Sequence, residues 1–131
     1  MNTNVLMTTS AVSLLTAGII LTFLPDEIIK YAYLENTRPL QLLLQIIGAL
    51  YFGFGMLNWM NKSGLIGGIY NRPVAVANFT HFFIAGLALI KGIMANPDLP
   101  KTIWIVSCVY LIFAISFGIV LFRHPLTEKK L

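Results

Sequence analysis

Four long apolar runs separated by short polar breaks dominate the pattern of the chain. Each run is 20 or 21 residues long, and together they cover residues 5–24, 40–60, 74–94 and 103–122. About 20 residues at a rise of 1.5 Å each cross a hydrocarbon core of about 30 Å. Backbone groups find no water in that core, so a spanning segment of this kind must be helical. The pattern predicts an all-α polytopic membrane protein: a four-transmembrane-helix bundle forming one domain over residues 1–131.

The first break predicts an additional short element. Pro25, Asp26 and Glu27 follow the first apolar run, and a proline with two acids suits the first turn of a new helix. Two tyrosines, Tyr31 and Tyr33, follow them, and tyrosine is enriched at the level of the lipid headgroups. We therefore expect a short interfacial helix over residues 25–34.

Composition agrees with a lipid environment. The chain is 57% hydrophobic and 11% charged, with a mean hydropathy of +0.80, whereas soluble domains carry about 25% charged residues. Thirteen of the fourteen charged residues lie outside the four runs, and the exception, Lys91, lies three residues from a run's end. These numbers exclude an ordinary soluble enzyme. The absence of Asp and Glu from the runs also argues against a proton-coupled exporter.

The basic residues and the cysteine exclude further classes of protein. The net charge of +4 comes from Lys and Arg residues that stand singly, apart from Lys129 and Lys130, so no basic stripe predicts a nucleic-acid partner. Cys108 is the single cysteine, which excludes an internal disulfide and any multi-cysteine metal site.

The distribution of Lys and Arg predicts an orientation. With four spans, both termini and the middle loop share one side, which holds five basic residues: Lys62, Arg72, Arg123, Lys129 and Lys130. The other side holds four: Lys30, Arg38, Lys91 and Lys101. The positive-inside rule then predicts that both termini lie in the cytoplasm. The membrane we expect is a plasma or inner membrane.

Each apolar run carries a stripe of small or polar residues when its positions are placed at about 100° per residue. Small residues let helices approach closely, and polar ones bond across helices, so these stripes are expected to face the bundle. In the first and second runs they are Thr9, Ser13 and Thr16, and Gln41, Gln45, Gly48, Phe52, Gly55 and Trp59. In the third and fourth they are Val74, Asn78, His81, Ala85, Ala88 and Gly92, and Ser107, Tyr110, Ala114 and Gly118. On the third run, Phe79, Phe83, Leu87 and Ile90 are expected to meet lipid.

Five residues are the candidates for a site: Asn58, Trp59, Asn78, His81 and Arg72. In the predicted orientation they gather at the cytoplasmic mouth of the bundle, where they either bind a ligand or bridge helices. An ionisable residue inside a span, here His81, is a functional hypothesis by default. The other histidine, His124, lies at the end of the fourth run, so no pair of membrane histidines predicts a haem. We expect no metal, no cofactor and no catalytic residue.

These features favour a non-enzymatic accessory or scaffold subunit, or an assembly partner, over an enzyme. The partners expected are the lipid bilayer, further copies of the chain as a homo-oligomer, or a larger membrane complex. One alternative is a binding protein for a lipid or hydrophobic small molecule with its pocket at the cytoplasmic mouth. A third hypothesis is a small enzyme or channel that uses His81.

Overall fold

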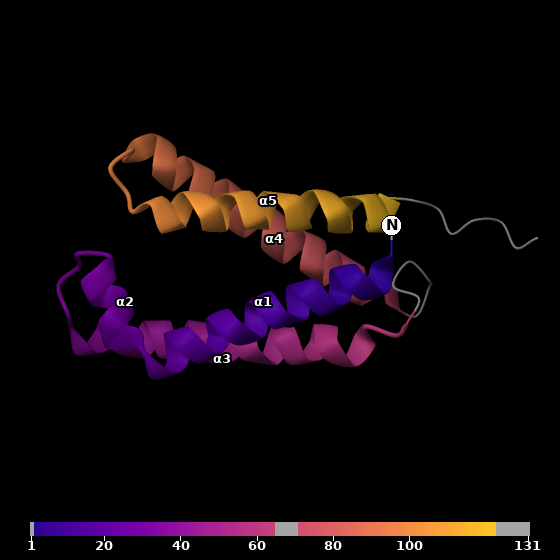
Figure 1. Ribbon diagram of the computed structural model, residues 1–131, viewed down its shortest axis with the longest axis horizontal. Helices are drawn as coiled ribbons and strands as arrows, with labels where there is room; N and C mark the ends of the chain where they lie inside the picture. Colours follow the sequence, from indigo (N-terminus) through magenta and orange to yellow (C-terminus); the bar gives the residue numbers. More distant parts are fainter. Residues whose placement is uncertain (1, 65–70, 123–131) are drawn as a thin grey trace, which may run out of the picture. The chain divides into compact units, whose positions relative to one another are not determined.

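The protein is all-helical over the residues that its computed structural model describes, 2–64 and 71–122, where no strand occurs (Figure 1). The helices are α1 (Thr3–Phe23), α2 (Pro25–Tyr31), α3 (Arg38–Asn61), α4 (Arg72–Ala95) and α5 (Lys101–Phe122). Helices α1, α3, α4 and α5 are long and apolar enough to cross a membrane, which confirms the predicted class of fold. Arg123, His124, Lys129 and Lys130 lie outside the described residues.

The helices begin earlier than the apolar runs because polar residues start them. Asn2 caps α1, its side-chain oxygen accepting a hydrogen bond from the Asn4 backbone N–H at 3.1 Å. Helices α3 and α4 each open on an arginine followed by a proline, and proline is favoured in the first turn of a helix. The short helix α2 also opens on proline, at Pro25, and it ends at Tyr31 rather than at residue 34.

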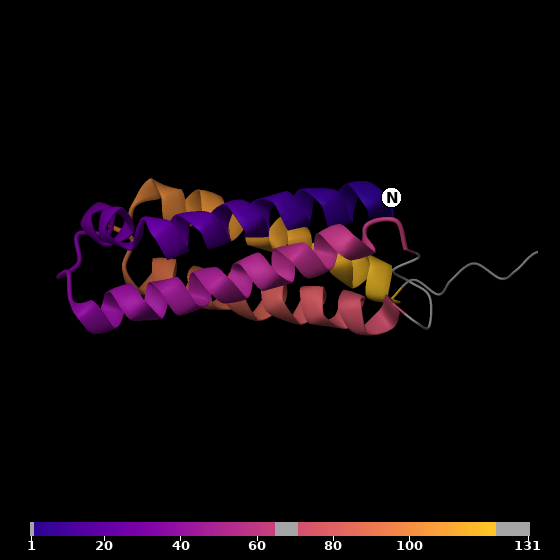
Figure 2. The ribbon, with the colours of Figure 1, turned by 90° about the horizontal axis from the view of Figure 1, so that it is seen from below.

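The chain divides into two compact units, each organised around one antiparallel helical hairpin. In the first unit, residues 2–63, α1 packs along α3 (Figure 2). Gln45 Nε2 donates to the Thr22 carbonyl oxygen at 3.4 Å near one end, and Ser10 contacts Asn58 near the other. Residue numbers therefore fall along α3 as they rise along α1, which fixes the register of this hairpin.

Three glycines, Gly18, Gly48 and Gly55, bring the backbones of α1 and α3 into close contact, and we call them the glycine seam. A Cβ added at Gly18 would lie 2.7 Å from the Phe52 backbone nitrogen, and one at Gly48 would lie 2.8 Å from the Gly18 carbonyl oxygen. A Cβ at Gly55 would lie 2.9 Å from the backbone nitrogen of Leu15. Such separations are too short for a real side chain. Because no Cβ intervenes, the two helices touch backbone to backbone.

The stripe predicted for the first span does not face α3. Thr9, Ser13 and Thr16 are exposed, and the buried residues of α1 are Leu6, Met7, Ser10, Ala11, Leu14 and Gly18. The Thr9 hydroxyl donates to the Val5 carbonyl oxygen of its own helix at 2.9 Å. A hydroxyl satisfied in this way needs no partner on a second helix, so Thr9 can face lipid.

The second unit includes α4 and α5, which pack through aromatic rings instead of glycines. Phe82 is 1% exposed, and its ring lies 4.8 Å from that of Phe113, 5.2 Å from that of Tyr110 and 5.8 Å from that of Phe117. Offset and edge-to-face ring pairs at these distances stabilise a contact beyond the area they bury. This aromatic cluster forms the centre of the second hairpin.

The face of α4 that packs against α5 includes Phe79, which the sequence pattern predicts to meet lipid. Phe83 and Leu87 are exposed as expected, but Phe79 packs edge-on against Phe122 with ring centroids 5.9 Å apart. Phe82 belongs neither to the stripe predicted to face the bundle nor to the residues predicted to meet lipid, yet it is the most buried ring of α4. The small-residue criterion failed here because a helix can bury a large ring when its partner offers others of the same kind.

Candidate functional site

The five candidate site residues belong to both units of the chain. Asn58 and Trp59 lie near the end of α3, whereas Arg72, Asn78 and His81 lie on α4. The contacts of each residue within its own unit indicate what that residue does locally.

Asn58 pairs with Ser10 of α1 inside the first unit. Its Nδ2 atom donates to Ser10 Oγ at 3.1 Å, and both residues are 0% exposed. The Ser10 hydroxyl in turn donates to the Met7 carbonyl oxygen at 3.0 Å. In a medium without water, a satisfied polar pair of this kind holds two helices in one register.

Sequence reasoning missed Ser10, although the residue carries the contact. Ser10 follows Thr9 directly in sequence, and the periodicity predicts that Thr9, and not Ser10, faces the other helices. The sequence does contain a signal for Ser10. The connection between the first two runs is short, so the two helices must be antiparallel, and the start of α1 then lies beside the end of α3. Asn58 then needs a polar partner from the first turns of α1, and Ser10 is the residue that faces it.

Trp59 faces away from this pair. Its side chain is 41% exposed, and the Lys62 ammonium lies 3.3 Å from the centroid of its ring. This is a cation–π contact between a helix end and the residue that follows it. A tryptophan and a lysine together at a span end are typical of the layer where lipid meets water. The side chains of Trp59 and Asn58 therefore point in different directions, although the two residues are adjacent in sequence.

Asn78 and His81 lie one turn apart on α4 and are engaged in the second unit. Asn78 Nδ2 donates to the Val74 carbonyl oxygen of its own helix at 2.9 Å. The His81 ring packs edge-on against Phe82 at 5.0 Å and lies 5.7 Å from the Tyr110 ring of α5. His81 thus borders the aromatic cluster. Arg72 is exposed in the first turn of α4.

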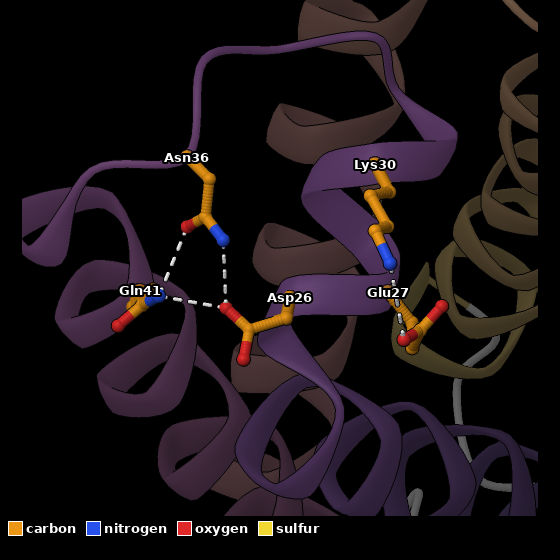
Figure 3. A network of polar contacts seen from close by, with 5 residues as sticks. All are labelled: Asp26, Glu27, Lys30, Asn36 and Gln41. Atoms are coloured by element: carbon orange, nitrogen blue, oxygen red, sulfur yellow. Dashed lines mark hydrogen bonds and ion pairs between the residues drawn. The ribbon is translucent and has the colours of Figure 1, made fainter.

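A polar network at the other end of the first hairpin was not predicted as a unit (Figure 3). Asp26 Oδ1 accepts hydrogen bonds from Gln41 Nε2 at 2.6 Å and from Asn36 Nδ2 at 3.0 Å. Arg38 Nη1 donates to Gln41 Oε1 at 3.1 Å. The sequence predicts Asp26 at a helix start and Gln41 on the bundle-facing stripe of the second run, but only the closed hairpin brings the two residues together. We call Asp26, Asn36 and Gln41 the Asp26 clasp.

Three kinds of comparison with known proteins found nothing similar: no family model, curated protein or solved structure matches this chain. Within the described residues, no three His, Cys, Asp or Glu side chains come together in a group that could hold a metal ion. In the contacts described above, polar side chains bond to the helices of their own unit.

The Asn58–Ser10 hydrogen bond can be tested with a double-mutant cycle. We expect Asn58→Ala and Ser10→Ala each to lower the free energy of unfolding, and the double variant to lose less than their sum, because the two side chains bond to each other. The expected coupling is about 1 kcal/mol, as for other interhelical bonds in membranes. The measurement is reversible unfolding in mixed micelles.

Thr9→Ala provides the matched control, since Thr9 is exposed beside Ser10 and bonds to its own helix. It is expected to show no coupling to Asn58→Ala. Strictly additive losses for Ser10 and Asn58 would contradict the interhelical bond.

Proposed function

We propose that this chain is a small, non-enzymatic integral membrane protein that serves as an accessory or scaffold subunit, or as an assembly partner. The observation that carries the proposal is the Asn58–Ser10 pair: the candidate residue most buried in the first unit is engaged in joining two helices. On this proposal the five candidate residues are structural and do not bind a substrate.

A second polar side chain that bonds between the helices of the first hairpin supports the same proposal. Gln45 of α3 bonds to the Thr22 carbonyl oxygen of α1. Polar groups of this kind specify which helices pair and in what register. The loops between the apolar helices are short, which leaves most of the chain in the membrane, where a subunit contacts its neighbours side by side.

We propose further that the chain resides in a plasma or inner membrane with both termini in the cytoplasm. The orientation is supported by the count of Lys and Arg, five on the side of the termini and four on the other. Three of the five basic residues on the side of the termini, Arg123, Lys129 and Lys130, belong to the C-terminal tail.

Crosslinking in native membranes tests the proposal. A chain tagged at Leu131 is expected to be recovered in a species larger than the monomer, of constant composition between preparations, and the tag is expected to react only with reagents that enter the cytoplasm. Gly53→Ala serves as the control that retains this species, since a Cβ there meets nothing within 4 Å. Gly48→Leu, which breaks the first hairpin, is expected to lose it.

Two results would contradict an assembly role. One is recovery of the monomer alone after crosslinking. The other is a monomer that carries a stoichiometric lipid, pigment or other hydrophobic small molecule, which would favour the ligand-binding alternative.

A further inference from the structure

The connection between α1 and α3 has to lie at one surface of the membrane. Helix α1 ends at Phe23 and α3 begins at Arg38, and the two helices are antiparallel and apolar. A helix of 21 residues, such as α1, is about 32 Å long, which matches the hydrocarbon core. The connection, which includes α2, therefore starts and ends at the same boundary between lipid and water.

Helix α2 is fixed to the hairpin instead of extending into water. Pro25 is buried and Ile29 is 1% exposed, so one side of α2 packs onto the chain. The Asp26 clasp ties the start of α2 to the first turn of α3 through Gln41 (Figure 3). Helix α2 is held at the depth at which α3 begins.

The end of α2 directs Tyr33 outward. The Leu34 backbone N–H donates to the Ile29 carbonyl oxygen, and the Tyr33 N–H donates to that of Lys30, each at 3.1 Å. These two bonds form a Schellman motif, in which the residue at the position of Tyr33 adopts a left-handed conformation, here with φ 56°. The Tyr33 side chain is 92% exposed.

The exposed residues around α2 divide by chemistry. At about 100° per residue, the side of α2 that faces away from Pro25 and Ile29 has two flanks. One flank is charged and carries Asp26, Glu27 and Lys30, with a Lys30–Glu27 ion pair at 4.0 Å. The other carries Ile28, which is partly buried, and Tyr31, which is exposed, and the exposed side chains of Tyr33 and Leu34 follow in sequence.

We propose that Tyr31, Tyr33 and Leu34 form a lipid-anchoring surface, which inserts into the headgroup layer of the bilayer that α1 and α3 cross. Tyrosine suits this layer because its ring is apolar and its hydroxyl is polar. Phe23 and Leu24, at the end of α1 where the connection starts, are apolar and exposed as well. The charged flank of α2 then faces water.

The charge of the connection defines the kind of lipid surface. Residues 24–38 contain the acids Asp26, Glu27 and Glu35 and the bases Lys30 and Arg38, so their formal charge is −1. A segment of this charge gains nothing from anionic headgroups, unlike a polybasic one. The partner is therefore the interfacial layer itself, and insertion does not depend on the content of anionic lipid.

Site-directed spin labelling of the full chain tests the proposal. In a Cys108→Ser background, the nitroxide is attached at Tyr31→Cys or at Leu34→Cys, with Glu27→Cys on the charged flank as the matched control. The chain is reconstituted into phosphatidylcholine vesicles, with or without phosphatidylglycerol. We expect the ratio of oxygen to nickel-chelate accessibility to be several-fold higher at 31 and 34 than at 27, in both kinds of vesicle.

Three results would overturn the proposal. They are a nickel-dominated label at both 31 and 34, labels there that neither reagent reaches, and an oxygen ratio that rises only when phosphatidylglycerol is added. The use of two label sites protects the test against a local disturbance at either one.

The Asp26 clasp is tested in the same preparation. We expect Asp26→Ala to release α2, so that a label at 34 becomes more mobile and more accessible to the nickel chelate. A label at 34 that is unchanged in mobility and accessibility would overturn the holding role of Asp26.

Discussion

Replacing Gly48 with alanine is expected to lower the free energy of unfolding of the first hairpin by about 2 kcal/mol. The added Cβ would lie 2.8 Å from the Gly18 carbonyl oxygen and 2.8 Å from the Thr22 backbone nitrogen, and neither atom is the end of a flexible side chain. The two helices must then separate along the glycine seam, and overpacking of this kind typically costs 1–3 kcal/mol. Unfolding in mixed micelles, followed by circular dichroism, measures the loss.

Gly53 on the same helix is the control for this experiment. A Cβ at Gly53 meets nothing within 4 Å, so alanine there introduces no clash. Because alanine favours a helix over glycine by about 0.5–1 kcal/mol, Gly53→Ala is expected to leave stability unchanged or to raise it. Equal losses for Gly48→Ala and Gly53→Ala would show that the seam is not a close backbone contact.

Replacing Phe82 with alanine is expected to have the largest effect on the second hairpin, a loss of about 3–5 kcal/mol. Phe82 is nearly fully buried among Tyr110, Phe113 and Phe117, so its removal leaves a cavity lined by three rings. All three rings are attached to the backbone of α5, so they cannot collapse fully into that space. The measurement is the same unfolding experiment, read at the near-ultraviolet signal of the aromatic residues.

Phe83 provides the comparison with the same chemical change one position along α4. Its ring stacks on Phe79 at 5.3 Å but is 44% exposed. Phe83→Ala is therefore expected to cost less than about 1 kcal/mol, since it removes an exposed ring and opens no cavity. A loss for Phe83→Ala as large as that for Phe82→Ala would contradict the assignment of Phe82 to the core of this hairpin.

The sequence predicts the helices well because one strong physical signal defines them. A run of 20 apolar residues has few structural options in lipid, so the four long helices follow from hydropathy alone. Their starts are less well predicted, since Arg38 and Arg72 are charged and yet helical. Pro39 and Pro73 carry the missing signal, because proline is favoured in the first turn and therefore marks a nearby helix start.

The candidate site was harder to predict because periodicity gives the faces of a helix but not their neighbours. Thr9 and Ser10 differ by one position, and either could supply a hydroxyl to α3. The choice depends on register and on whether a hydroxyl bonds to its own helix, as Thr9 does. Asn58 was identified as a bridging candidate from its polarity alone, whereas its partner required the geometry of the closed hairpin.

The antiparallel register of α1 and α3 has a consequence for the order of events during synthesis. Thr22 and Ser10, which bond to Gln45 and Asn58, belong to the part of the chain that is made first. When α3 enters the membrane, the acceptors of Gln45 and Asn58 are already present in α1. These two side chains can therefore form their hydrogen bonds before any later segment of the chain is made. The first hairpin can therefore close as a unit while the ribosome is still translating α4 and α5, in keeping with the N-terminal-first folding of nascent chains.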